Sequence, residues 1–151
     1  MTALTLRRSV IATLISLALV SAWGCSSPTR ISYIPEGGSY TANDLTGILD
    51  ATDLDKTASI PVDDIDETRQ EALADLRTHG DDAAALADTL THQFPVDVNA
   101  VPIEARAVTY EGQPAWIVVE SWGEAGEQLS SARLWVFSAE DHSLITAASG
   151  Q

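Results

Sequence analysis

The spacing of apolar side chains changes near the middle of the chain. From Thr41 to Pro95 apolar residues recur every three or four positions, which is typical of amphipathic helices. From Ile103 onward they recur at every second position, which is typical of half-buried strands. Helices followed by alternating strands predict an α+β fold, in which two or three N-terminal helices pack on a three- to four-stranded antiparallel meander.

Three helices are expected between residues 41 and 95, and each begins at a polar side chain that can cap its first turn. An acidic loop over residues 50–61 separates the first helix from the second. The capping candidates are Thr41 or Asn43, Asp63 or Asp64, and Asp81 or Asp82. Helical spacing places on one face of the successive helices Leu45, Ile48 and Leu49, then Ile65, Arg69, Ala72, Leu73 and Leu76, and then Ala83, Leu86, Ala87 and Leu90.

Four strands are expected in the second half of the chain. The pattern places them at residues 103–110, 115–122, 129–138 and 144–148. The second of these is the strongest prediction, because β-branched and aromatic residues dominate it.

Alternation divides the central strand into an aromatic face and an aliphatic face. We expect the aliphatic face to meet the helices, whose apolar stripes consist of Leu and Ala. The aromatic face is either closed by the first helix and the segment before it, or open as a platform for a peptide, a sugar or a partner protein. On this face Glu120 is expected to pair with Arg133 across the strands. The partner-binding candidates are Trp116, Trp122, Trp135 and Phe137.

The chain begins like an export signal. Arg7 and Arg8 make its start positive, and an apolar run over residues 10–20 follows. This run is too short to span a membrane, which takes about 20 apolar residues. The two arginines fit general secretion and also a loose twin-arginine pattern, so both export routes stay open.

The segment Ser21-Ala22-Trp23-Gly24-Cys25 resembles the lipobox of bacterial lipoprotein precursors, with Trp23 where a small residue is usual. The resemblance implies cleavage before Cys25 and attachment of a diacylglycerol to its thiol. Acyl chains such as palmitate would then anchor the protein in the cell membrane, on its extracytoplasmic side. Whether this is an inner or an outer membrane stays open.

This interpretation divides the chain into three parts. Residues 1–24 are expected to be a lipoprotein signal peptide and residues 25–39 a flexible tether rich in Ser, Pro and Gly. Residues 40–151 are then a single α+β domain.

The composition is strongly acidic, with 22 Asp and Glu against 8 Lys and Arg and a formal charge of −14. Cleavage before Cys25 would remove Arg7 and Arg8 and no acidic residue, which changes the charge to −16. Such a charge argues against nucleic acid, whose binding needs clustered basic residues. Cys25 is the only cysteine, which excludes an intramolecular disulfide and a cysteine-based zinc site.

No catalytic or metal-binding set stands out. His79, His92 and His142 are scattered, and His92 has a simpler role as the helical i,i+4 partner of Asp88. The acidic residues over 50–67 suggest calcium, but no Gly provides the bend of a calcium loop and no Glu closes it. We therefore expect no enzymatic activity, no cofactor and no metal.

The C-terminal half resembles the small exported PepSY-type domains of the bacterial envelope. The resemblance rests on a helical segment followed by Val-Thr-Tyr-Glu-Gly-Gln-Pro-Ala-Trp at 108–116 and Leu-Trp-Val-Phe-Ser-Ala-Glu at 134–140. Ala-Glu-Asp-His at 139–142 replaces the usual Asp-x-x-Thr-Gly turn. The resemblance implies a module that binds or inhibits peptidases rather than a catalyst.

Together these features predict a non-enzymatic binding or structural module of the cell envelope, anchored through Cys25. One alternative is an inhibitor or accessory subunit of an envelope enzyme that uses the aromatic face. Another is a small hydrolase, which a cleft holding a buried carboxylate pair or an Asp-His-Ser arrangement would favour.

Overall fold

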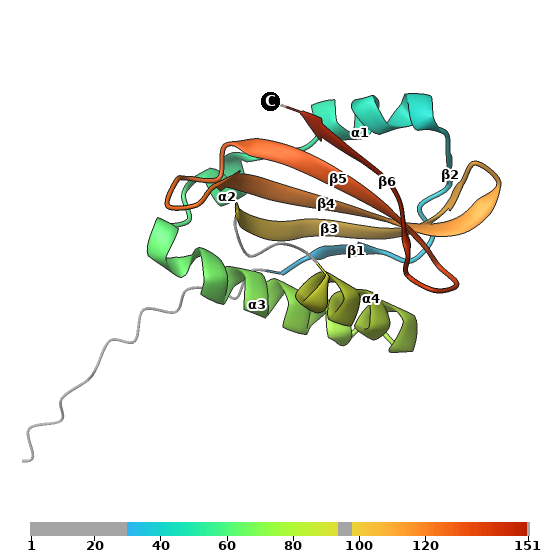
Figure 1. The fold of residues 1–151 in the computed structure, drawn as a ribbon, viewed down its shortest axis with the longest axis horizontal. Coiled ribbons are helices and arrows are strands. Elements are labelled where there is room, and N and C mark those ends of the chain that lie inside the picture. The colour runs from blue at the N-terminus through green and yellow to red at the C-terminus, as the bar shows by residue number, and fades with distance from the viewer. Residues whose placement is uncertain (1–29, 94–97, 151) are drawn as a thin grey trace, which may run out of the picture.

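The computed structural model describes residues 30–93 and 98–150, which form one sheet with helices on both of its faces (Figure 1). Within these residues the sheet has six strands in the order β1-β3-β4-β5-β6, and β2 also pairs with β3. The strands are β1 (Ser32–Ile34), β2 (Ser39–Tyr40), β3 (Val98–Tyr110), β4 (Gln113–Glu124), β5 (Ser131–Ser138) and β6 (Leu144–Gly150). The helices are α1 (Leu45–Asp50), α2 (Asp55–Ala58), α3 (Ile65–Arg77) and α4 (Asp81–His92), with 3₁₀ helices at Ala42–Asp44 and Val62–Asp64.

The antiparallel meander from β3 to β6 confirms the strand predictions from alternation. A two-residue turn joins β3 to β4, since Tyr110 pairs with Gln113. Both turn residues have positive φ, 49° at Glu111 and 82° at Gly112, as the turns favoured in tight hairpins require. The α+β class is thereby confirmed, whereas the expected strand number is wrong.

The two additional strands come from the expected tether. β1 and β2 both run parallel to β3, and the buried Ile31 just before β1 donates its N–H to Asp75 Oδ2 at 3.2 Å. The sheet therefore already includes residues 32–34, ahead of the domain start expected at Tyr40, and the four described helices follow two strands rather than opening the domain. Strands this short carry almost no alternation, which is why the pattern missed them.

The helices α3 and α4 pack on the aromatic face of the sheet, which is the opposite of the expectation. Figure 1 shows them on one side of the sheet and α1 on the other. The aromatic-face core combines helix and strand residues: Leu73, Leu76, Leu86, Leu90, Trp116, Val118 and Phe137. The physical reason is size, since α3 and α4 have 13 and 12 residues and α1 has 6. Only the longer pair provides enough apolar surface to bury the Trp and Phe rings.

The aliphatic face has a thinner cover. Leu45 and Leu49 of α1 pack there against strand residues that include Ile117, Leu134 and Val136. The short helix α2 lies within the expected acidic loop, where Thr57 is buried. Because α1 and α2 are only 6 and 4 residues long, part of this face stays uncovered.

Candidate functional site

A cleft of about 760 Å³ lies on the aliphatic side of the sheet, where α1 and α2 meet β1, β2, β3 and β4. This volume is within the range of small-molecule sites, roughly 300–1,000 Å³. Its lining combines apolar, hydroxyl and charged side chains. The residues that define the cleft are Arg30, Ile31, Ser32, Ser39, Tyr40, Asp44, Gly47, Ile48, Ala51, Thr52, Asp53, Lys56, Thr57, Ile103, Glu104, Arg106 and Val119.

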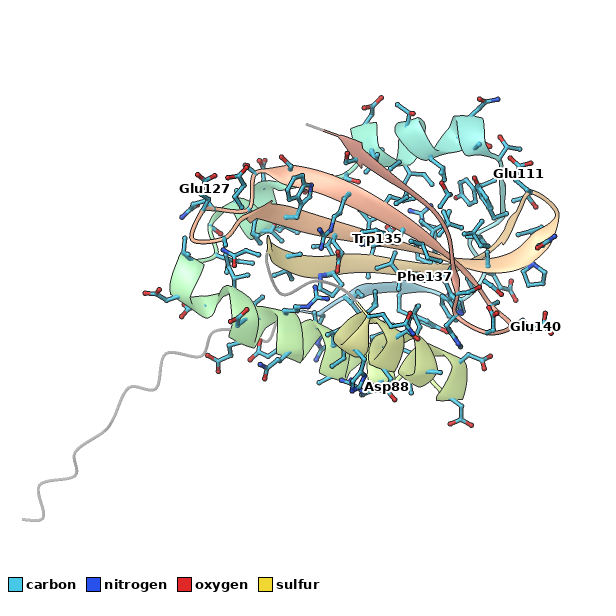
Figure 2. The ribbon with its side chains drawn as sticks, viewed as in Figure 1. Asp88, Glu111, Glu127, Trp135, Phe137 and Glu140 are labelled. Atoms are coloured by element: carbon cyan, nitrogen blue, oxygen red, sulfur yellow. The ribbon has the colours of Figure 1, made fainter. Side chains whose placement is uncertain are left out.

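Two contacts hold the helical wall of the cleft in place. Thr57 of α2 is hydrogen-bonded to Ser121 of β4, with 2.8 Å between the hydroxyl oxygens. At the other end, the N–H of Ala42 donates to Glu111 Oε1 at 2.8 Å, and Glu111 lies in the hairpin beside α1 (Figure 2). The cleft wall is thus fastened to the sheet near both of its ends.

Arg106 crosses the floor of the cleft from β3. Its Nε donates to Glu104 Oε1 at 2.6 Å and its Nη1 donates to the Tyr40 hydroxyl at 2.8 Å. Burial lowers the pKa of Arg106, but the hydrogen bond and the attraction from Glu104, together with Tyr40, outweigh burial and raise it above its ordinary value. The guanidinium is therefore a permanent and well-oriented charge.

The acidic and basic residues of the lining differ in their hydrogen bonding. Asp44 Oδ2 accepts from the Thr41 N–H, Asp53 Oδ1 accepts from the Asp55 N–H, and Glu104 accepts from Arg106. Among the described residues no ion pair or hydrogen bond engages the charged groups of the other two basic lining residues, Arg30 and Lys56. The cleft therefore offers cations that lack an internal counterion.

A second cluster of charges is buried on the aromatic face. The Glu120 side chain is 0% exposed, and its carboxylate accepts from Arg69 Nη1 at 2.9 Å, from Arg133 Nε at 2.8 Å and from Trp135 Nε1 at 2.8 Å. Burial raises the pKa of Glu120, but the attraction of Arg69 and Arg133 and the donated hydrogen bonds outweigh it and lower the pKa. The predicted pair of Glu120 with Arg133 is confirmed, and they are directly opposite in the register.

This cluster joins the helices to the sheet. Arg69 also donates to two backbone carbonyl oxygens, Ala100 on β3 at 3.0 Å and Leu90 on α4 at 3.1 Å. One guanidinium thus links α3, α4 and the sheet. We interpret the cluster as structural, because its central carboxylate is enclosed and has three donors.

The aromatic partner-binding candidates do not form an open platform. Trp116 is 4% exposed and Phe137 is 0% exposed, both beneath α3 and α4. Figure 2 shows Trp135 and Phe137 on β5, where Phe137 belongs to the aromatic-face core. Trp122 and Trp135 are half-buried, and the Arg133 guanidinium lies 5.8 and 4.9 Å from their ring centroids. Of the four candidates, Trp116 and Phe137 are therefore covered by helices, whereas Trp122 and Trp135 stay partly exposed.

The other polar candidates are dispersed. The Asp88 carboxylate binds Arg77 of α3, and His92 Nδ1 approaches the backbone oxygen of Asp88 at 2.7 Å, so the expected side-chain pair does not form. His79 stacks on Tyr33 with 4.3 Å between ring centroids. In the described part of the chain, no three His, Cys, Asp or Glu residues come together as metal ligands. Cys25 lies outside the described residues.

Comparisons with protein-family models, with curated proteins and with solved structures gave no match for this chain. Within the described residues no helix is both long and apolar enough to cross a bilayer.

The sequence pattern missed the residues of the cleft. Arg30 and Tyr40 lie in or beside the expected tether, and Lys56 lies in the expected loop. Arg106 carried a usable signal, because a charged residue within the alternating strand 103–110 falls on a face shared with apolar residues.

Proposed function

We propose that this protein is a lipid-anchored, extracytoplasmic binding module of the bacterial cell envelope, and that the cleft beside α1 and α2 is its ligand site. The observation that carries the proposal is the cleft itself, which combines a volume of small-molecule size, apolar walls and a few oriented polar groups. Small-molecule sites are built in this way. The anchor is supported by the positive start, the short apolar run and the lipobox-like segment at Cys25.

Binding explains the cleft better than catalysis does. Its lining offers guanidinium, ammonium and hydroxyl groups, and no histidine is among the described residues that line it. The hydrolase alternative called for a cleft with a buried carboxylate pair. The described residues bury one carboxylate, Glu120, which lies on the other face with its oxygens occupied by Arg69, Arg133 and Trp135. The arrangement holds groups in place rather than activating a nucleophile.

The alternative of an envelope-enzyme inhibitor with an aromatic docking face has less support, because two of its four candidate residues, Trp116 and Phe137, are buried beneath α3 and α4. A peptide or protein remains a conceivable occupant of the cleft only as an extended segment that fits its volume. We therefore propose a small ligand.

The anchor is tested by mass spectrometry of the protein purified from membranes of its bacterial host. We expect a mature N-terminus at Cys25 with a diacylglycerol on its sulfur, and we expect Cys25→Ala to move the protein to the soluble fraction. Cys25→Ser keeps the size of the side chain but also removes the thiol, so it should move to the soluble fraction as Cys25→Ala does. An unmodified thiol in membrane-bound wild type would overturn the anchor.

The cleft is tested by filling it. Gly47 of α1 lines the cleft, and a Cβ added there meets nothing within 4 Å. We expect Gly47→Trp to abolish the co-purification of any small molecule that the wild type retains. Ala74→Trp places the same residue at an exposed position on α3, away from the cleft, and should leave them in place. Identical profiles for wild type and both variants would contradict a ligand site in this cleft.

A further inference from the structure

The basic residues of this acidic chain are unevenly distributed. Of its 8 Lys and Arg residues, Arg7 and Arg8 belong to the expected signal peptide. Arg30, Lys56 and Arg106 line one cavity. The remaining three are neutralised by carboxylates, Arg69 and Arg133 by Glu120 and Arg77 by Asp88. Within the described residues, the two basic side chains that form no ion pair, Arg30 and Lys56, therefore both line the cleft.

The register places the two unpaired cations toward the same end of the cleft. β1 runs parallel to β3 with Ser32 opposite Glu104, so Arg30, two residues earlier, lies toward Pro102. Lys56 precedes Thr57, whose hydroxyl bonds Ser121, and Ser121 is opposite Val101. Both cations thus lie toward the Val101–Pro102 end.

The rest of the cleft is different in character. Ile48, Ile103 and Val119 give it apolar walls, and all three belong to or pack against the aliphatic-face core. The far end is closed by the Arg106–Tyr40 hydrogen bond, in which the guanidinium is already held by Glu104. A ligand that matches this lining has an anionic group at one end and an apolar portion beside it.

The expected lipid anchor lies close to this cleft along the chain. Cys25 precedes Ile31 by six positions, and Ile31 lines the cleft and is buried in the domain. An extended chain covers at most about 3.6 Å per residue, so a lipidated Cys25 would keep the Ile31 side of the cleft within roughly 22 Å of the anchor. The molecules nearest to the cleft would then be those of the membrane surface.

We propose that the cleft binds an anionic amphiphile, with its phosphate or carboxylate group at Arg30 and Lys56 and its apolar portion against Ile48, Ile103 and Val119. This inference deepens the proposed function. The chemistry of the ligand does not depend on the lipid anchor. The anchor matters only for whether the ligand comes from the adjoining membrane or from the surrounding solution.

Calorimetric titration tests the chemistry separately from the anchor. The purified full chain carrying Cys25→Ala is titrated with monomeric dihexanoyl phosphatidylglycerol, dihexanoyl phosphatidylcholine and inorganic phosphate. We expect the anionic lipid to bind at least about tenfold more tightly than the zwitterionic lipid, the size of one charge-assisted hydrogen bond, and more tightly than phosphate. Equal affinity for the two lipids, binding of neither, or phosphate binding as tight as the anionic lipid would overturn the proposal.

Two matched pairs of variants locate the binding. Arg30→Gln with Lys56→Gln should reduce affinity for the anionic lipid to that for the zwitterionic one. Arg77→Gln removes a basic residue outside the cleft and should change nothing. Ile48→Ser should weaken binding of the anionic lipid, whereas Ile145→Ser, at a 43% exposed position on β6, should not. Equal effects within either pair, with unchanged unfolding midpoints, would show that the ligand binds elsewhere.

Photo-crosslinking distinguishes the two sources. Anionic lipid with a photoreactive acyl chain is placed either in vesicles that carry the lipidated wild-type protein or, as a short-chain form, in solution with Cys25→Ala. Crosslinks to residues of the cleft in vesicles identify the membrane as the source, and crosslinks only in solution identify a free amphiphile. Absence of crosslinks to the cleft in both arms, or their persistence in Gly47→Trp, would overturn the site.

Discussion

The two faces of the sheet differ in how completely they are covered. On the aromatic face α3 and α4 bury Trp116 and Phe137, and the Glu120 cluster ties the helices to the strands. On the aliphatic face the shorter helices α1 and α2 leave a cleft of about 760 Å³. The same sheet is therefore a closed core on one side and a half-covered surface on the other.

Large aromatic side chains therefore need not mark the binding surface of a sheet. Burial of Trp and Phe contributes the most free energy, so the fold is most stable when the longest helices cover them. The face with smaller side chains tolerates a partial cover, and polar groups such as Arg106 and Tyr40 then remain accessible to a ligand.

Glu120→Gln is expected to have the largest effect on the closed face. It removes the charge that balances Arg69 and Arg133 and leaves two guanidinium groups without a counterion between the helices and the sheet. Breaking a buried ion pair by removing one partner costs about 3–5 kcal/mol of unfolding free energy, which urea titration measures. Asp88→Asn removes a 62% exposed partner of Arg77 and should cost about 1 kcal/mol or less. Equal losses would show that the cluster does not close this face.

The lowered pKa of Glu120 predicts that the stability difference between wild type and Glu120→Gln depends on pH. Although burial raises the pKa of Glu120, Arg69 and Arg133 hold it below its ordinary value of 4.5. As the pH falls, the unfolded chain therefore takes up the proton first, and the stabilisation is lost as the pH passes through the lower folded pKa. The difference in unfolding free energy between wild type and Glu120→Gln should be constant well above pH 4.5 and shrink below it. A difference that persists unchanged into strong acid would contradict the lowered pKa.

Leu76→Ala and Leu49→Ala compare the two covers directly. Leu76 on α3 is 0% exposed, and its truncation should cost about 2–5 kcal/mol through lost burial and a residual cavity. Leu49 lies on the six-residue α1, which borders open space and can shift to fill the gap, so its loss should be toward the lower end of that range. Chemical denaturation of the two variants gives both values. A larger loss for Leu49→Ala would reverse the assignment of the closed and the half-covered face.

The sequence predicted the meander and its order well, because alternation extends over whole strands such as Ala115 to Trp122. It also predicted the pairing of Glu120 with Arg133, since a charged residue within an apolar strand needs a partner. The helices α3 and α4 were predictable for a similar reason, because each shows more than two turns of helical spacing.

Long-range pairing made the rest unpredictable. β1 has three residues and β2 has two, and both are stabilised by β3, more than sixty residues away along the chain. Which face of the sheet the helices cover depends on their combined length. Periodicity shows which side of each helix is apolar but not which face of the sheet that side covers. The cleft follows from both facts, because its walls are these short strands and the short helices α1 and α2.

Gly37→Ala tests whether the segment before α1 belongs to the folded domain. Gly37 donates its N–H to Ala107 O at 2.7 Å, and an added Cβ would lie 2.9 Å from Val108 Cγ1 and 3.0 Å from Ala107 O. The strand must shift to relieve this contact, at a cost of about 1–3 kcal/mol in a urea titration. Ser39→Ala, at an exposed position two residues later, should be nearly neutral. If both variants were neutral, the interpretation of this segment as a flexible tether would stand again.

Gly47→Ala is expected to have the smallest effect, and of the opposite sign. Gly47 lies inside α1, where Gly costs about 0.5–1 kcal/mol relative to Ala because it loses more backbone entropy on folding. An added Cβ there meets nothing within 4 Å, so the full gain should appear as a higher unfolding midpoint. Gly80→Ala is the contrasting control, because a φ of +110° strains any other residue and should lower the midpoint. A higher midpoint for Gly47→Ala would show that the backbone entropy of Gly47, and not a steric contact on this side of α1, limits the stability of the helix. A lower midpoint would mean that other atoms pack against this side of α1. The cleft that distinguishes the two faces would then be closed.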